Sequence, residues 1–166
     1  MSDQIRIGVI GAGRIGKLHA RNLSFMIPDA EIIAVSDVYL EAAKQCAAEC
    51  HIPKATTDHR EIMEDPNVDA LFICSSTDTH SQMIVEGAEA GKHIFMEKPC
   101  CVDAGGFRSL METNKLADEK GLKVGVGLFR RHMPHYIETM DKLHNGEFGK
   151  IQFLRNYCNM TAWGAH

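Results

Sequence analysis

A short apolar run that stops at closely spaced glycines constrains the fold of this chain more than any other feature. Residues 5–10 read Ile-Arg-Ile-Gly-Val-Ile, and Gly11-Ala12-Gly13-Arg14-Ile15-Gly16 follows directly. A β-branched run of this length is typical of a buried parallel strand, and the apolar residues from 15 to 25 fall near one face of a helix. The glycine-rich segment therefore joins a strand to a helix, where this spacing predicts a dinucleotide-binding turn rather than an ordinary glycine turn.

Each glycine of this turn has a physical role in such a site. Gly11 permits the tight turn, Gly13 lets the backbone approach a pyrophosphate, and Gly16 allows the helix to pack closely on the sheet. The first turn of the helix faces the anion with its N–H groups. The predicted cofactor-binding residues of this segment are Gly11, Gly13, Arg14, Ile15 and Gly16.

Strands and helices alternate along the rest of the first 126 residues, with short connections. The expected strands are 5–10, 32–35, 54–57, 69–74, 93–96 and 122–126, and the expected helices are 15–25, 39–50, 59–63, 79–90 and 103–120. Each crossover between parallel strands must be right-handed, so helices cover both faces. The pattern predicts an α/β fold with a doubly wound parallel sheet of about six strands, a Rossmann domain over 1–125.

The last 41 residues, 126–166, do not continue this alternation. A helix is expected over 132–144, and residues 150–157 alternate as a strand would. We expect 126–166 to comprise a connecting helix and the first strand of a second α/β domain that is cut off.

Asp37 lies at the end of the second expected strand, close to the ~20-residue separation at which an acid bonds the adenosine ribose. Its carboxylate would repel a 2′-phosphate, and Val38 and Tyr39 supply no cation to neutralise one. The sequence therefore favours NAD over NADP. A solvated acid or a helix cap is the alternative at this position.

Charge and hydropathy exclude several classes of partner. The 18 basic and 22 acidic residues give a net charge of −4 and no basic patch, so nucleic acid is not expected. No apolar run is long enough for a membrane span, and the start does not resemble a secretory signal. We expect a cytoplasmic protein with no membrane partner.

Six cysteines are present, but a chain of this length and core content has no need of a disulfide framework. Cys46, Cys50 and His51 lie close together, although no second ligand pair follows with zinc spacing. Structural packing is favoured over metal binding there, and no metal site is expected. The adjacent Cys100 and Cys101 have no clear role.

Four motifs in order make the chain resemble the oxidoreductases grouped with glucose–fructose oxidoreductase and inositol 2-dehydrogenase. They are GVIGAGRIGKLHARNL at 8–23, VSD at 35–37, CSSTDTHSQM at 74–83 and GKHIFMEKP at 91–99, supported by GLFRRHMPHY at 127–136. Together they cover most of the chain. The Glu97-Lys98-Pro99 triplet after a strand is the most specific of them.

The resemblance implies roles that the residues alone do not show. It places Lys98 beside the nicotinamide and the reacting carbon, where an ammonium can stabilise a developing alkoxide and pass on a proton. Family members often hold the bond before Pro99 in the cis form. The loop after the fourth strand departs from the family, because it lacks the common proline. The implied cofactor-cleft residues are Ser75, Ser76, Thr77, His80, Glu97 and Lys98, with His80 expected to pack near the cofactor rather than transfer protons.

Arg131 aligns with an arginine on the substrate side of the family's cleft, although Arg130 offers a competing alignment and both could be surface charges. The family's second domain supplies the substrate pocket and further catalytic groups, and its open sheet often forms a homo-oligomer. We therefore expect a parent protein that associates with itself and a fragment nearly inactive alone.

The expected function is NAD-dependent hydride transfer from a secondary alcohol of a sugar, cyclitol or related polyol. A non-catalytic regulator of the same fold that senses dinucleotide is the alternative, and Lys98 favours the enzyme because a sensor has no need of it. A third possibility is a cofactor-binding module that serves only in assembly.

Overall fold

A computed structural model of the chain describes residues 4–157. The chain divides after Gly127 into two compact units, and each is described by itself. The first unit contains the sheet and the helices that cover it. The described residues of the second contain one helix and a 3-10 turn.

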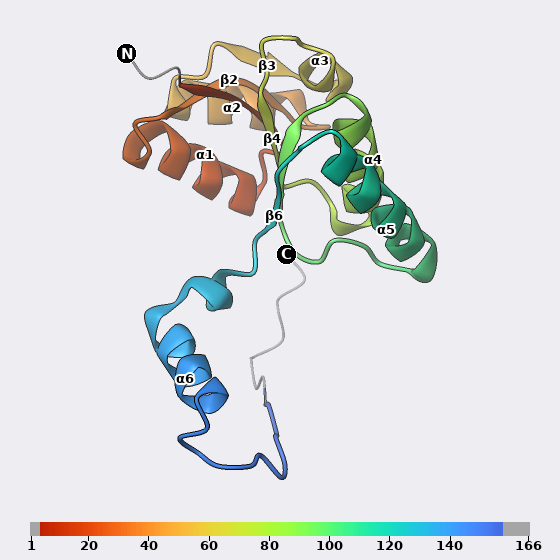
Figure 1. Ribbon diagram of the computed structural model, residues 1–166. Coiled ribbons are helices and arrows are strands. Elements are labelled where there is room, and N and C mark those ends of the chain that lie inside the picture. The colour runs from red at the N-terminus through yellow and green to blue at the C-terminus, as the bar shows by residue number, and fades with distance from the viewer. Residues whose placement is uncertain (1–3, 158–166) are drawn as a thin grey trace. The chain divides into compact units, whose positions relative to one another are not determined.

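Within the described residues of the first unit, six strands form one sheet in the order β3-β2-β1-β4-β5-β6 (Figure 1). Every neighbouring pair is parallel. The predicted doubly wound sheet is therefore confirmed. The strands are β1 (Ile5–Ile10), β2 (Ala30–Ser36), β3 (Lys54–Thr56), β4 (Ala70–Ile73), β5 (His93–Met96) and β6 (Val124–Val126).

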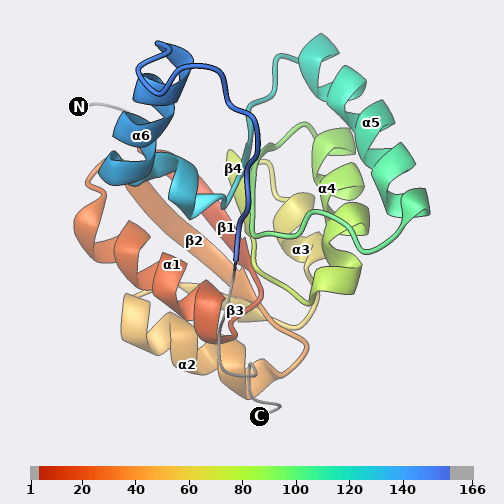
Figure 2. The same ribbon diagram turned by 90° about the horizontal axis from the view of Figure 1, so that it is seen from below.

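Helices lie on both faces of this sheet, with α1 and α2 on one face and α3, α4 and α5 on the other (Figure 2). Each face has its own apolar core. Val9, Leu23 and Cys46 belong to the core beneath α1 and α2, whereas Leu71 and Ile84 belong to the core beneath the other helices. The helices are α1 (Arg14–Met26), α2 (Leu40–Cys50), α3 (Arg60–Met63), α4 (His80–Glu89) and α5 (Ala104–Glu119), with a 3-10 turn η1 at Thr77–Thr79.

The sheet is predictable because its strands are buried on both sides and read as short apolar runs. Val9, Val35 and Leu71 are fully buried at the centre of the sheet. Strand ends differ from the predicted ones by up to two residues, as hydrogen-bond assignments at termini commonly do. The helix predicted over 103–120 begins one residue later, because Asp103 is its N-cap and accepts a hydrogen bond from the backbone N–H of Gly106 (2.6 Å).

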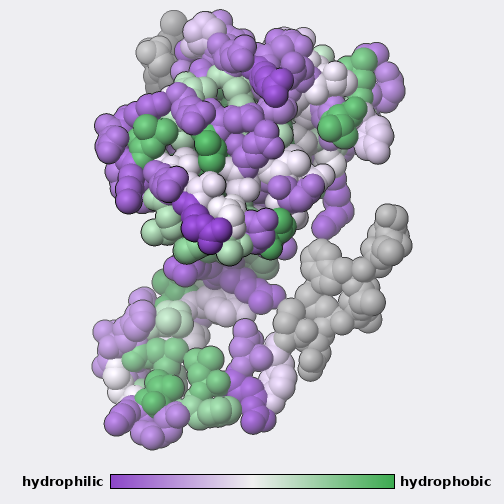
Figure 3. All heavy atoms as spheres, turned by 90° about the vertical axis from the view of Figure 1, so that its right-hand side faces the viewer, coloured by the Kyte–Doolittle hydropathy of each residue, from purple (hydrophilic) through white to green (hydrophobic). Residues whose placement is uncertain are grey.

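The second unit contains a 3-10 turn, η2 (Phe129–His132), and one helix, α6 (Pro134–His144), as expected over 132–144. Proline at the first helical position fits the start of α6, because its missing N–H would have no partner there. Large apolar side chains gather at the surface of this unit, among them Ile137, Met140 and Phe148 (Figure 3).

The strand predicted over residues 150–157 is wrong, because the described residues of that segment form no strand. Its alternating side chains fit a strand, but a strand also needs a neighbouring backbone to pair with. No described segment pairs with it. That 126–166 begins a second domain stays a prediction.

Candidate functional site

The glycine-rich turn lies at the carboxyl end of β1 and leads into α1. Gly11 has a φ of 98°, a backbone conformation that residues with a side chain rarely adopt. Its N–H donates a hydrogen bond to the carbonyl oxygen of Ser36 (2.8 Å). A Cβ atom on Gly16 would collide with the carbonyl oxygen of Gly11. The first and third glycines are therefore required by the turn itself.

Gly13 differs from both, because a Cβ atom there would meet no described atom within 4 Å. Within the described chain, no side chain caps the N-terminus of α1, and its first turn contains no acid. Arg14 is exposed and Ile15 half-buried at this end. An open cradle beside uncapped helical N–H groups fits a pyrophosphate.

Asp37 follows β2 and bonds the same turn. Its Oδ2 accepts a hydrogen bond from the backbone N–H of Ala12 (2.7 Å), and its Oδ1 accepts one from that of Tyr39 (2.9 Å). A carboxylate has about four acceptor positions, so capacity for ribose hydroxyls remains. Asp37 therefore also shapes the glycine-rich turn, a role that the sequence analysis did not assign.

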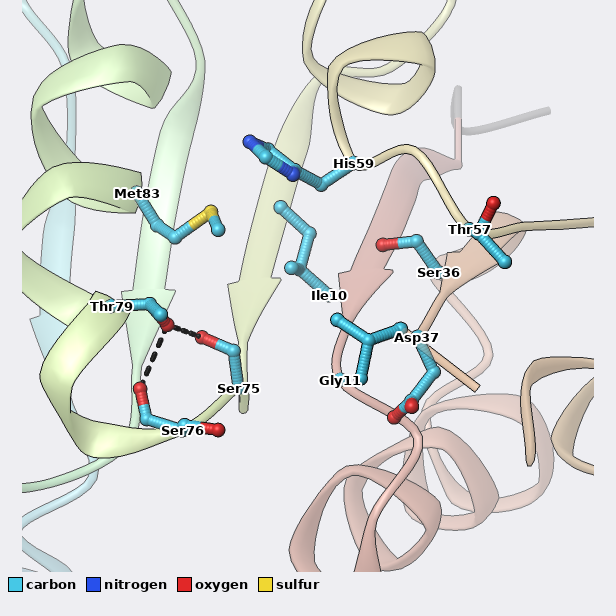
Figure 4. A pocket seen from close by; sticks show the side chains of 11 residues that line it. Ile10, Gly11, Ser36, Asp37, Thr57, His59, Ser75, Ser76, Thr79 and Met83 are labelled. Atoms are coloured by element: carbon cyan, nitrogen blue, oxygen red, sulfur yellow. Dashed lines mark hydrogen bonds between the residues drawn. The ribbon is translucent and has the colours of Figure 1, made fainter. Parts of the chain in front are cut away.

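A pocket opens beside these residues at the carboxyl ends of β1, β2 and β4 (Figure 4). The Ser36 hydroxyl is buried in its wall and has no hydrogen-bond partner among the described residues. His59 contributes its ring, and Nε2 lies 3.0 Å from Oε2 of Glu86. The labelled lining residues are Ile10, Gly11, Ser36, Asp37, Thr57, His59, Ser75, Ser76, Thr79 and Met83.

Sequence reasoning missed Ser36, Thr57 and His59 as lining residues. Ser36 directly precedes the predicted ribose acid, and that adjacency was an available signal. A buried hydroxyl without a partner is costly, so a ligand group that bonds it would gain affinity. The pocket therefore offers one polar contact beyond those expected.

The loop after β4 forms the opposite wall. The hydroxyls of Ser75 and Thr79 lie 2.7 Å apart, and Thr79 Oγ1 donates to the Ser76 carbonyl oxygen at 2.8 Å (Figure 4). Ser75 and Ser76 line the pocket, whereas Thr77 is not among its lining residues and begins η1. These side-chain bonds order a loop that lacks the family's proline.

His80 begins α4 and is only 2% exposed. Its Nδ1 lies 2.7 Å from the carbonyl oxygen of Pro99, and its Nε2 lies 3.1 Å from that of Ser75. Carbonyl oxygens only accept hydrogen bonds, so whichever ring nitrogen carries the proton is the donor. The geometry agrees with packing rather than proton transfer.

Glu97, Lys98 and Pro99 follow β5 at the same edge of the sheet, and the Lys98–Pro99 bond is cis, as the resemblance implied. Lys98 is exposed. Oε1 of Glu97 lies 2.8 Å from Nε2 of His19 on α1, and its Oε2 accepts a hydrogen bond from the Lys98 N–H (3.2 Å). His19 was missed, although it lies one turn after the glycine-rich segment.

In the structure, Cys46, Cys50 and His51 do not gather into a group of candidate metal ligands. Cys46 and Cys50 are buried in the core, where burial raises the pKa of both thiols, that of Cys46 to about 11. His51 is exposed and follows α2 in a left-handed conformation. In the part of the chain that the structure describes, no group of three candidate ligands could hold a metal.

Arg131 belongs to η2 in the second unit and is exposed, and Arg130 stacks over the ring of Phe129 at 5.6 Å. Their assignment to the substrate side stays a prediction. Among residues 4–157, no helix is long and apolar enough to cross a membrane.

Comparison with known proteins adds family evidence to this geometry. A family model described as an oxidoreductase family with an NAD-binding Rossmann fold matches residues 5–128. The chain is 43% identical over 158 residues to the uncharacterized oxidoreductase YrbE of Bacillus subtilis, covering 93% of this chain and 44% of that protein. It is 40% identical over 151 residues to the myo-inositol 2-dehydrogenase of Thermotoga maritima, covering 91% of this chain and 44% of that one.

A solved structure agrees with these relatives. The crystal structure of scyllo-inositol dehydrogenase from Lactobacillus casei with bound NAD(H) and scyllo-inositol superposes with a TM-score of 0.79 at 29% identity. The match covers 88% of this chain and 42% of that one. The chain thus spans about 44% of the length of the curated relatives named above.

Proposed function

Because the chain belongs to the oxidoreductase family with an NAD-binding Rossmann fold, we propose that its complete gene product is an NAD-dependent dehydrogenase acting on a cyclitol. The reaction transfers hydride from the carbinol carbon of a secondary alcohol to NAD and releases the hydroxyl proton, which leaves a ketone, or it runs in reverse. Sugars and other polyols are the wider substrate class. The chain supplies the cofactor-binding domain of this enzyme.

The convergence of four strand ends carries the proposal. The order β3-β2-β1-β4-β5-β6 reverses direction between β1 and β4, and ligands of such sheets bind outside the carboxyl ends at that point. The glycine-rich turn, Asp37, the Ser75 loop and Lys98 all follow strands at this edge. A cofactor cradle and a candidate catalytic cation thus share one edge of the sheet.

Different residues would bind different parts of the dinucleotide. The N-terminus of α1 would hold the pyrophosphate, with Gly13 giving its oxygens access to the backbone. Asp37 would accept hydrogen bonds from the adenosine ribose, and its charge would disfavour a 2′-phosphate, so NAD is preferred over NADP. Nicotinamide, when bound, supplies the hydride acceptor.

Lys98 would act at the reacting oxygen. Its ammonium can donate a hydrogen bond to the substrate hydroxyl oxygen and stabilise negative charge there as the proton leaves. Groups that orient the substrate would come from beyond the matched domain. Such positioning can account for ~7–11 kcal/mol of the reaction barrier, so the matched domain alone would catalyse poorly. We therefore propose that residues from 128 onward lead to the substrate-binding part, with Arg131 on that side.

The test uses the complete gene product with NAD and NADP and a panel of myo-inositol, scyllo-inositol, glucose and sorbitol, read by nicotinamide absorbance. We expect turnover of an inositol with NAD, reduced about 10²- to 10⁴-fold in Lys98→Ala. The NAD dissociation constant should change little in that variant. Lys98→Arg keeps the positive charge but changes the position of the donor, so it tests whether charge alone is sufficient.

Other outcomes discriminate the alternatives. NAD binding without turnover of any polyol would favour the dinucleotide-sensing regulator, and no binding of either nucleotide would favour the assembly module. Self-association of the parent, a cytoplasmic location and the absence of nucleic-acid partners stay predictions from the sequence.

A further inference from the structure

Glu97, immediately before Lys98, is held by a histidine from α1. Nε2 of His19 lies 2.8 Å from Oε1 of Glu97, and the two side chains are 21% and 15% exposed. A carboxylate can only accept, so the Nε2–H of His19 is the donor. The other carboxylate oxygen accepts the N–H of Lys98 itself (3.2 Å).

The surroundings leave the Glu97 carboxylate little freedom. A Cβ atom on Gly127 would lie 2.8 Å from Oε1 of Glu97, so the chain approaches the carboxylate closely there. The rings of Phe72 and Phe95 stack at 4.6 Å, and the His19 ring meets Phe95 edge-on at 5.2 Å. Glu97 is thus largely enclosed by side chains and backbone, with 15% of its side chain exposed.

Pro99, immediately after Lys98, is held by a second histidine from the other layer of the fold. The buried His80 ring lies 2.7 Å from the Pro99 carbonyl oxygen through Nδ1 and 3.1 Å from the Ser75 carbonyl oxygen through Nε2. A neutral ring donates through one nitrogen only, and the shorter contact assigns that proton to Nδ1. His80 therefore ties the segment of Lys98 to the first residue of α4, beside the loop that lines the pocket.

The two histidines bracket Lys98 from opposite faces of the sheet. His19 lies on α1, which follows the glycine-rich turn, and His80 begins α4, which follows the Ser75 loop. Both helices pack on the sheet through buried residues, Leu23 for α1 and Ile84 for α4. The backbone on each side of Lys98 is thereby fixed to a rigid element.

We propose that His19, acting through Glu97, and His80 are positioning residues that hold Lys98 in its reactive placement. This inference rests on the proposed function, because the purpose of the placement is the dehydrogenase reaction. Neither histidine is a catalytic residue in this account. A displacement of about 1 Å at a reacting group can cost on the order of 10²-fold in rate, so bonds at both neighbours of Lys98 have kinetic consequences.

The test compares paired variants of the complete gene product. His19→Phe keeps an aromatic ring against Phe95 but removes the donor, whereas His19→Gln keeps an amide donor. His80→Gln keeps a donor at the buried position, where a bulkier change could prevent folding. His93→Gln is the control, because His93 lies at the opposite end of β5 and accepts one hydrogen bond, from the N–H of Lys123 (3.0 Å).

We expect His19→Phe to lower kcat about 10- to 100-fold while the NAD dissociation constant changes less than about threefold. His19→Gln and His80→Gln should retain most of the activity, and His93→Gln should leave kcat unchanged. Hydrogen exchange resolved to single amides gives a reading that needs no substrate. Exchange at the Lys98 amide should accelerate in His19→Phe, while the Glu97 amide, which donates to the Ile73 carbonyl oxygen (2.9 Å), stays protected.

The two readings separate this inference from the proposed function. If the wild-type protein turns over no polyol, the proposed function fails, and amide exchange still shows whether His19 orders the segment. Unchanged exchange at Lys98 in His19→Phe would overturn the inference. A loss of melting temperature with unchanged kcat would overturn it as well, because the histidine would then be structural only.

Discussion

The carboxylate of Asp37 accepts a hydrogen bond from the backbone N–H of Ala12 at 2.7 Å, so the end of β2 is bonded directly to the glycine-rich turn. The acid that we assign to the ribose is thus also a structural member of the pyrophosphate cradle. Any substitution of Asp37 acts on both roles. Substitutions at Asp37 must therefore distinguish its hydrogen bond to the glycine-rich turn from its negative charge.

Asp37→Asn should separate them in part, because its one amide oxygen can still accept the Ala12 N–H, while the negative charge and the bond from the Tyr39 N–H are lost. We expect a melting temperature slightly below that of the wild type and about tenfold less preference for NAD over NADP. Asp37→Ala should lose both roles and weaken NAD binding about 10- to 100-fold, the value of a hydrogen bond to a charged group. Calorimetric titration with both nucleotides measures these effects.

Asp65→Asn is the matched control for Asp37, since Asp65 also accepts a backbone N–H, from Asn67 (2.8 Å), but in the loop before β4. Its affinity for NAD should equal that of the wild type. Unchanged NAD binding in Asp37→Ala would show that the ribose is recognised elsewhere.

Gly13→Ala should weaken NAD binding with little loss of stability, whereas Gly16→Ala should destabilise the fold. Gly13 has open space around a Cβ atom and an extended conformation that alanine adopts, so Gly13→Ala should fold with a stability change below about 0.5 kcal/mol. It should nevertheless weaken NAD binding about tenfold or more, because the methyl group occupies the approach to the pyrophosphate.

Gly16→Ala should lower the free energy of unfolding by about 1–3 kcal/mol, since its Cβ would collide with the Gly11 carbonyl oxygen. Denaturant titration and calorimetry on the two variants separate folding from binding. Tight NAD binding by Gly13→Ala would mean that the pyrophosphate does not lie over this turn.

The sheet could be predicted because each strand is a local property of the sequence. Residues 5–10 are a short apolar run closed by glycine, and the structure has β1 at Ile5–Ile10. The alternating segment 150–157 satisfied the same kind of rule and formed no strand. Pairing requires a second backbone, and the sequence of one segment does not show whether a partner is present.

The contacts that complete the site could not be predicted, because they join residues far apart in the chain. His19 and Glu97 are separated by 78 positions and meet only when α1 packs on the sheet. His80 was predicted to pack near the cofactor, but its two carbonyl partners depend on the path of both loops. Motif spacing predicts which residues reach an edge of the sheet, whereas packing determines which of them bond.

The Arg6–Asp69 pair should make stability depend on pH in the acid range. Three hydrogen bonds from Arg6 reach the Asp69 carboxylate, at 2.9, 2.9 and 3.1 Å, and the guanidinium bonds hold the pKa of that carboxyl below its ordinary value. A lowered folded-state pKa stabilises the fold above the unfolded pKa of about 3.9, and this contribution disappears as pH falls through the folded value.

Asp69→Asn should therefore be less stable than the wild type at neutral pH, by about 1 kcal/mol because the pair is partly exposed. The difference should shrink below about pH 4 as the wild-type carboxyl takes up its proton. Urea titration across this range measures it. Glu41→Gln, which removes an exposed pair with Lys44, is the control, and an Asp69→Asn deficit that persists in acid would contradict the electrostatic account.

The cysteines should differ in reactivity according to burial. Burial raises the pKa of Cys74 to about 12 and that of Cys46 to about 11, so both remain protonated and inert at mildly alkaline pH. Among the cysteines that the structure describes, Cys101 is partly exposed and should be alkylated first by iodoacetamide. Peptide mass spectrometry gives the rate at each site, and unfolding in guanidinium, where all of these thiols should react, is the control.

The same labelling tests the structural role of Cys46 and Cys50. Added Zn²⁺ should not change their alkylation, because their thiols lie in the core beneath α2 and His51 is exposed. Protection of both thiols by Zn²⁺ in the partly unfolded protein alone would reflect binding to the unfolded chain. Protection in the folded protein, with a raised melting temperature, would instead require a metal site that closes around these two cysteines, and the packing account would be wrong.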